Sequence, residues 1–128
     1  MMSENFRMLI EKLKAKTLKK EALWTMTSRD NEFKLDFGKG AVTTDNWQSD
    51  QSGMELVDLA IFNDTGDKID YISYDETEIE QYQMLLDLHT LAKSSYYRAD
   101  ETFLHIFKEL DTNKTIGVER KRQDDLPF

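Results

Sequence analysis

Residues 33–40, which read Phe-Lys-Leu-Asp-Phe-Gly-Lys-Gly, decide the fold of this chain. Apolar side chains alternate with charged ones over the first five positions, and this period of two is typical of a β-strand with one buried face. The run Gly38-Lys39-Gly40 predicts a tight turn, because glycine adopts backbone angles that other residues avoid. The chain should therefore reverse direction here, so that residues 41–47 form a second strand antiparallel to the first.

Strand patterns extend outward on both sides of this hairpin. Residues 23–27 precede it, and residues 57–61 and 69–74 follow it with the same alternation. A segment rich in turn-forming residues, 63–67, separates the last two strands. Consecutive strands joined by short connections favour an antiparallel meander, so we expect about five strands in a mainly antiparallel sheet.

A helix should precede these strands. Ser3 can cap its N-terminus, because a serine side chain accepts a hydrogen bond from a backbone N–H group of the first turn. The helix should end between Lys16 and Lys20. Its apolar residues recur at helical spacing and form one stripe, at Phe6, Leu9, Ile10 and Leu13.

Two helices should follow the strands. Thr77 and Glu80 have the spacing of a capping box, which predicts a helix from there to about Tyr97. Asp100 can cap a third helix. The apolar residues of this third helix are Phe103, Ile106, Phe107 and Leu110.

The order of these elements predicts an α+β fold, with an N-terminal helix, about five strands and two C-terminal helices. Residues 1–110 should form a single α+β domain. Residues 111–128 are polar and should form a flexible C-terminal tail with a docking tip, in which residues 115–118 are a candidate for a brief strand.

The chain of 128 residues carries a net charge of −8, and this charge is unevenly distributed. Residues 1–20 hold six basic and two acidic side chains, whereas residues 21–110 hold seven basic and nineteen acidic ones. An acidic body is a poor partner for a phosphate backbone. The absence of cysteine excludes disulfides and thiolate zinc sites. No signal-peptide core or membrane-length apolar run occurs, so we expect a cytoplasmic protein that makes no membrane contact.

No arrangement of residues predicts an enzyme, a metal site or a cofactor. Asp64-Thr65-Gly66 matches the aspartic-protease triplet, but it also matches an ordinary hairpin turn, and such proteases need two paired carboxylates. His89 and His105 lie on different predicted helices and do not form a helical pair of metal ligands. We therefore expect a non-enzymatic protein without a cofactor.

The last five residues form an acidic-apolar string, Asp124-Asp125-Leu126-Pro127-Phe128. This string resembles the acidic C-terminal tip of bacterial single-stranded-DNA-binding proteins, which recruits replication and repair enzymes. The resemblance covers five residues of 128. It implies partners such as helicases, nucleases and primosomal or recombination proteins. The predicted body departs from that family, whose OB-fold has its helix within the strand order.

The sequence leads to two functional hypotheses. The first is a bacterial or phage accessory protein of DNA replication or repair that docks partner enzymes through residues 124–128. The alternative is a small acidic binding module, such as an immunity protein or a DNA-mimic inhibitor, that acts through its acidic body. Direct contact with single-stranded DNA is a further expectation, because basic residues and aromatic rings bind such strands. The candidates for it are Arg120, Lys121, Arg122, Trp24 and Trp47.

Overall fold

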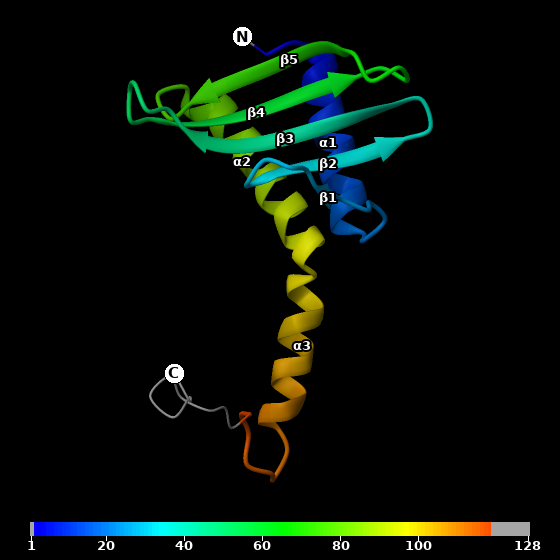
Figure 1. Cartoon of the computed structure of the whole chain (residues 1–128), viewed down its shortest axis with the longest axis vertical. Helices are drawn as coiled ribbons and strands as arrows, with labels where there is room; N and C mark the ends of the chain where they lie inside the picture. The colour runs from blue at the N-terminus through cyan, green and yellow to red at the C-terminus, as the bar shows by residue number, and fades with distance from the viewer. Residues whose placement is uncertain (1, 119–128) are drawn as a thin grey trace, which may run out of the picture.

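A computed structural model describes residues 2–118 of the chain (Figure 1). An N-terminal helix, α1, is followed by five strands and two further helices, as the sequence predicted. The elements are α1 (Glu4–Leu18), β1 (Thr25–Met26), β2 (Glu32–Phe37), β3 (Gly40–Gln48), β4 (Glu55–Phe62), β5 (Lys68–Asp75), α2 (Ile79–Tyr97) and α3 (Ala99–Leu110). The strands form one sheet in sequence order, and each is antiparallel to the next.

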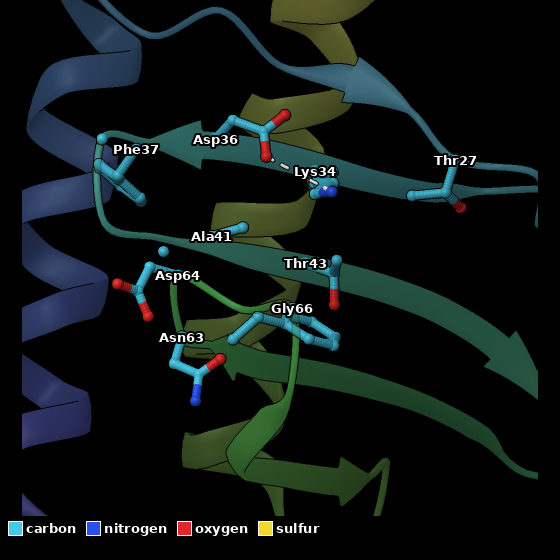
Figure 2. Close-up of a pocket in the computed structure, with 12 residues that line it drawn as sticks. Thr27, Lys34, Asp36, Phe37, Ala41, Thr43, Asn63, Asp64 and Gly66 are labelled. Carbon is cyan, nitrogen blue, oxygen red and sulfur yellow. Dashed lines mark ion pairs between the residues drawn. The ribbon is translucent and has the colours of Figure 1, made fainter.

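One face of the sheet is covered by α1 and α2, and the opposite face, called the open face below, carries no helix (Figure 1). The alternation in β2 sets this division. Phe33 is fully buried on the covered face, whereas Lys34 points to the open face (Figure 2). Across the strands, Phe33 pairs with Thr44, and Thr44 pairs with Leu59, so the buried positions of three strands form one row. Burying a large apolar side chain such as Phe33 or Leu59 contributes about 1.5–3 kcal/mol to the stability of the fold.

The predicted first helix is confirmed. Ser3 is its N-cap, and the Ser3 hydroxyl accepts a hydrogen bond from the backbone N–H of Phe6 at 3.3 Å. The apolar stripe faces the core, where Phe6, Ile10 and Leu13 are buried. The helix ends at Leu18, within the predicted limits.

The turn between β2 and β3 is also confirmed. Phe37 pairs with Gly40, so Gly38 and Lys39 alone form the loop of a two-residue hairpin. Gly40 is required by a close approach of the backbone, because a Cβ there would lie 2.6 Å from the carbonyl oxygen of Phe62. This contact lets the end of β4 lie against the start of β3.

Both predicted caps of the C-terminal helices are wrong. The N-cap of α2 is Glu78, which makes no side-chain cap. The Thr77 hydroxyl donates to the Asp75 carboxylate and accepts no hydrogen bond from a backbone N–H of the helix, so no capping box forms. The backbone N–H and the hydroxyl of Thr77 both donate to Asp75 in the turn that ends β5. The N-cap of α3 is Arg98, in the left-handed conformation with φ 53°, and Asp100 lies inside the first turn.

The core ends within α2, and α3 extends away from the sheet as a projecting arm (Figure 1). None of the residues of α3 is buried. The brief strand expected at residues 115–118 does not form. Among residues 2–118, no helix is both long enough and apolar enough to cross a membrane.

Candidate functional site

The predicted tip, residues 124–128, lies outside the residues that the structure describes, and so does the basic run Arg120-Lys121-Arg122. The structure does describe the other two candidates, Trp24 and Trp47, which lie in different parts of the fold.

Trp24 was predicted as a possible nucleic-acid contact, and its position contradicts that prediction. Its side chain is 4% exposed and belongs to the hydrophobic core. The Trp24 indole N–H donates to the Thr17 hydroxyl at 3.0 Å, and that hydroxyl donates to the Leu13 carbonyl. A ring in this position has no free face on which a base could stack.

Trp47 lies on the open face and is 38% exposed. Its indole N–H donates to the Asp58 carboxylate at 2.9 Å. The neighbouring carboxylates make this ring an unfavourable platform for a strand of phosphates. The basic Lys34 on the same face is ion-paired with Asp36 at 3.4 Å.

The open face carries a row of polar residues across four strands, called the carboxylate row below. It consists of Glu32, Asp45, Asp58 and Ser73, which are cross-strand partners in that order. The Ser73 hydroxyl donates to Asp58. Arg29 reaches over the row from the β1–β2 connection and places its Nη2 atom 2.7 Å from Asp45. Like charges on adjacent strands repel, so Arg29 holds the middle of the row together.

Asp45 is the buried carboxyl group of the row. Burial raises its pKa to about 6; Arg29 opposes this shift, and the negative charges of Glu32 and Asp58 reinforce it. Its Oδ1 atom is buried and has no hydrogen-bond partner among the described residues. A carboxyl group with this pKa can hold or release a proton near neutral pH.

The carboxylate row lacks the other parts of a catalytic or metal site. Among the described residues, no group of three or more His, Cys, Asp or Glu side chains could hold a metal ion. Asp45 does not line the cavity between the β2–β3 hairpin and the β4–β5 turn. Structural networks of charged groups shift pKa values as active sites do, so the raised pKa of Asp45 does not by itself indicate an active site.

A cavity of about 430 Å³ opens where the β2–β3 hairpin meets the β4–β5 turn (Figure 2). Its polar lining includes Thr43, Asp64 and the ion pair between Lys34 and Asp36. Figure 2 shows Asp64 at the rim, on the turn rather than on a strand. This lining offers hydrogen bonds to a small polar ligand.

The Asp64-Thr65-Gly66 triplet forms the β4–β5 turn. The Asn63 side-chain oxygen accepts hydrogen bonds from the backbone N–H groups of Thr65 and Asp67, at 3.1 and 2.9 Å. Gly66 has a φ of 86°, which favours glycine. The turn interpretation of this triplet is therefore confirmed.

Carboxylates also gather around the connection between β5 and α2, called the acidic end below. The Glu76 carboxylate accepts from the backbone N–H of Glu55 at 2.9 Å, and the Glu55 carboxylate accepts from the Tyr82 hydroxyl at 3.0 Å. Hydrogen bonds from Thr77 lower the pKa of Asp75. None of the ion pairs found among residues 2–118 includes a residue of the acidic end. Its members are Glu55, Asp75, Glu76, Glu78 and Glu80.

His89 is an interior histidine with a hydrogen-bond partner. It is 2% exposed, its Nε2 atom lies 2.8 Å from the Asn31 carbonyl, and its ring packs edge-on against Phe33. Burial lowers its pKa. His105 is exposed on the arm, so the two histidines lie in different environments.

Comparisons with known proteins give no match for this chain: no family model, no curated protein and no solved structure. Two features of the described residues were not predicted from the sequence. One is the carboxylate row, which depends on the register of four strands. The other is the exposed position of the apolar residues of α3.

Proposed function

We propose that this chain is a non-enzymatic accessory protein of DNA replication or repair that docks partner enzymes through residues 124–128. The observation that carries this proposal is the terminal string Asp-Asp-Leu-Pro-Phe. Its partners would be helicases, nucleases, or primosomal or recombination proteins that bind single-stranded-DNA-binding-protein tips.

The chemistry of the string suits a short docking peptide. Burial of the Phe128 ring in a partner's pocket contributes about 1.5–3 kcal/mol. Pro127 fixes its own φ and restricts Leu126, which lowers the entropy lost on binding. Carboxylates at Asp124 and Asp125 pair with a basic rim, so binding should weaken as salt increases.

The position of α3 supports this proposal. The arm leads the chain away from the sheet, so the residues after Leu110 start at a distance from the acidic body (Figure 1). A segment that follows the arm along the chain can reach a partner without bringing the acidic end against it. DNA binding by the body receives less support, because Trp24 is buried and Trp47 lies beside the carboxylate row.

The test is to measure binding of the fluorescently labelled full chain to a helicase or nuclease that binds such tips. Phe128→Ala should weaken binding by about 10–150-fold, which corresponds to the lost burial of the ring. Ile116→Ala is the matched control, because it removes another exposed apolar side chain from the C-terminal segment. Equal binding by the native chain and by Phe128→Ala would overturn the proposal.

The acidic end supports a second candidate function, that of an acidic binding module. Its carboxylates form no ion pair among the described residues. They are therefore available for electrostatic attraction to a basic protein. The discriminating variant is Glu78→Lys with Glu80→Lys. If it abolishes partner binding while deletion of residues 124–128 does not, the acidic module replaces tip docking as the function.

A further inference from the structure

The cavity between the β2–β3 hairpin and the β4–β5 turn, called the hairpin cavity below, is a hollow in the open face. Its floor consists of Ala41 and Thr43 of β3, two small residues. Their cross-strand partners on β2 are larger, because Asp36 faces Ala41 and Lys34 faces Thr43. On the other side, Phe62 of β4 faces Ala41. Small side chains between larger ones leave room on the surface of the sheet for another molecule.

The β4–β5 turn borders the hairpin cavity on the side opposite to β2. Asn63, Asp64 and Gly66 line the cavity from this turn, whereas Lys34 and Asp36 line it from β2 (Figure 2). The volume of about 430 Å³ lies in the range of about 300–1,000 Å³ that is usual for small-molecule sites. The hairpin cavity therefore has the size of a ligand-binding site.

The Thr43 hydroxyl has no hydrogen-bond partner among residues 2–118. Thr43 is only 8% exposed, and its hydroxyl is directed toward the side of the cavity where Gly66 lies (Figure 2). Buried hydroxyls in folded proteins nearly always form a hydrogen bond, because an unpaired polar group costs free energy. A ligand in the hairpin cavity would supply the bond that the described residues do not.

The carboxylate of Asp64 also has no partner. Within the described part of the chain it forms neither an ion pair nor a hydrogen bond. The Asp36 carboxylate contacts Lys34 through one oxygen, with 3.4 Å between Nζ and Oδ1, and its Oδ2 atom is available. An ionised carboxylate only accepts hydrogen bonds, and a hydroxyl can accept them as well. The unpaired groups of the hairpin cavity therefore suit a ligand that donates.

An ammonium group is the donor that fits best. It carries three N–H donors and a positive charge, and it has no acceptor that would need a partner in the protein. A ligand with a carboxylate of its own would be repelled by Asp36 and Asp64, and it would have to separate Lys34 from Asp36.

Apolar side chains complete the lining. The rings of Phe37 and Phe62 border the hairpin cavity, and Phe37 is 51% exposed. The lining thus combines carboxylates on two sides with apolar rings. An aliphatic chain that ends in two ammonium groups offers the matching combination, because its methylenes pack on rings and its ends pair with carboxylates.

We propose that the hairpin cavity binds a small aliphatic diamine or polyamine. One ammonium group pairs with Asp64, a second pairs with Asp36, and an N–H group donates to the Thr43 hydroxyl. This site lies on the sheet and does not depend on docking by the C-terminal tip.

Titration of the full chain with putrescine, 1,4-diaminobutane, followed by NMR or calorimetry, tests the proposal. Putrescine should bind saturably with a Kd on the order of 1 mM, because the ion pairs are partly exposed. Butylamine lacks the second ammonium group and should bind roughly 3–5-fold more weakly. 1,4-Butanediol has the same chain length without charge and should bind at least ~10-fold more weakly. Absence of saturable binding by putrescine up to about 20 mM, or equal binding by the diol, overturns the proposal.

Asp64→Asn tests the position of the ligand. It should weaken putrescine binding by roughly 3–5-fold and leave putrescine no better a ligand than butylamine. Asp50→Asn is the matched control, because it removes the same charge from the β3–β4 connection, outside the cavity lining. If Asp50→Asn weakens binding as much, the net charge of the chain attracts the amine and the hairpin cavity is not the site.

Thr43→Val tests the buried hydroxyl. The variant keeps the shape of the side chain and should weaken putrescine binding by roughly 3–10-fold. Its unfolding midpoint should not decrease, because the hydroxyl that it removes has no partner among the described residues. Thr25→Val, outside the cavity lining, should bind putrescine as the native chain does. A Thr43→Val protein that binds putrescine like the native chain overturns the contact with Thr43.

Discussion

The Trp24 indole N–H donates a hydrogen bond to the Thr17 hydroxyl at 3.0 Å. This bond joins the last turn of α1 to the chain that leads into β1, and both side chains are buried. The Thr17 hydroxyl in turn donates to the Leu13 carbonyl at 2.7 Å. The two bonds give both the Trp24 indole N–H and the Thr17 hydroxyl a partner, so Trp24 acts as a structural residue and not as a base-stacking one.

Thr17→Val should destabilise the fold by about 1–3 kcal/mol, because it keeps the shape of the side chain and leaves the indole N–H of Trp24 buried without an acceptor. Urea unfolding followed by tryptophan fluorescence measures the change. Thr25→Val is the matched control, since Thr25 is exposed. Its variant should change the free energy of unfolding by less than about 0.5 kcal/mol. Equal effects of the two variants would contradict the role assigned to Thr17.

Gly40→Ala should destabilise the fold by about 1–3 kcal/mol, because the new Cβ would lie 2.6 Å from the Phe62 carbonyl oxygen and the backbone would have to shift. Gly38→Ala provides the comparison in the same turn, where a Cβ meets nothing within 4 Å. Thermal unfolding should show a lower midpoint for Gly40→Ala alone. If Gly38→Ala lowers the midpoint as much, the close approach of β3 and β4 is not the cause.

The sequence predicted the elements whose determinants are local. The alternation from Phe33 to Phe37 sets the two faces of β2, and the adjacent glycines set the turn. Ser3 lies immediately before an apolar stripe, and so its capping role could be predicted as well. These features depend on a few neighbouring residues, which is why the order of helices and strands was correct.

The features that were missed depend on contacts between distant residues. Thr77 has two possible partners, the helix N-terminus and Asp75, and the turn geometry decides between them. The carboxylate row requires the register of β2, β3, β4 and β5, which no local pattern gives. The helix that holds Phe103, Ile106, Phe107 and Leu110 was predicted correctly, but its apolar residues do not specify whether the body covers them.

Asp45→Asn should change the pH dependence of stability. The pKa of Asp45 is raised to about 6 in the folded state, above its usual value of 3.8, so the folded protein binds the extra proton. Stability from this group is therefore present below pH 4 and is lost as the pH rises to about 6, by on the order of 1–3 kcal/mol. Urea unfolding at several pH values should show that Asp45→Asn removes this loss. Asp64→Asn, in an exposed turn, should retain the native profile.

His89→Gln should change the same profile in the opposite direction. Burial lowers the pKa of His89, so below about pH 6.5 the unfolded chain binds a proton that the folded protein refuses. Stability from this group is complete above pH 6.5 and decreases as the pH falls. Glutamine can still donate to the Asn31 carbonyl, but it cannot be protonated, so the variant should lose this acid sensitivity.

Asp45 and His89 therefore oppose each other between about pH 4 and 6.5, and the native protein should show a flatter profile than either variant. The Asp45→Asn protein should become less stable on acidification across this interval, and the His89→Gln protein should become more stable. Unfolding free energies of all three proteins, measured at about pH 4.5, 5.5 and 6.5, test whether these two groups control the pH dependence of stability. These pH values span roughly the interval set by the two pKa shifts. Two variants whose profiles run parallel to that of the native chain would show that neither group controls its response to pH.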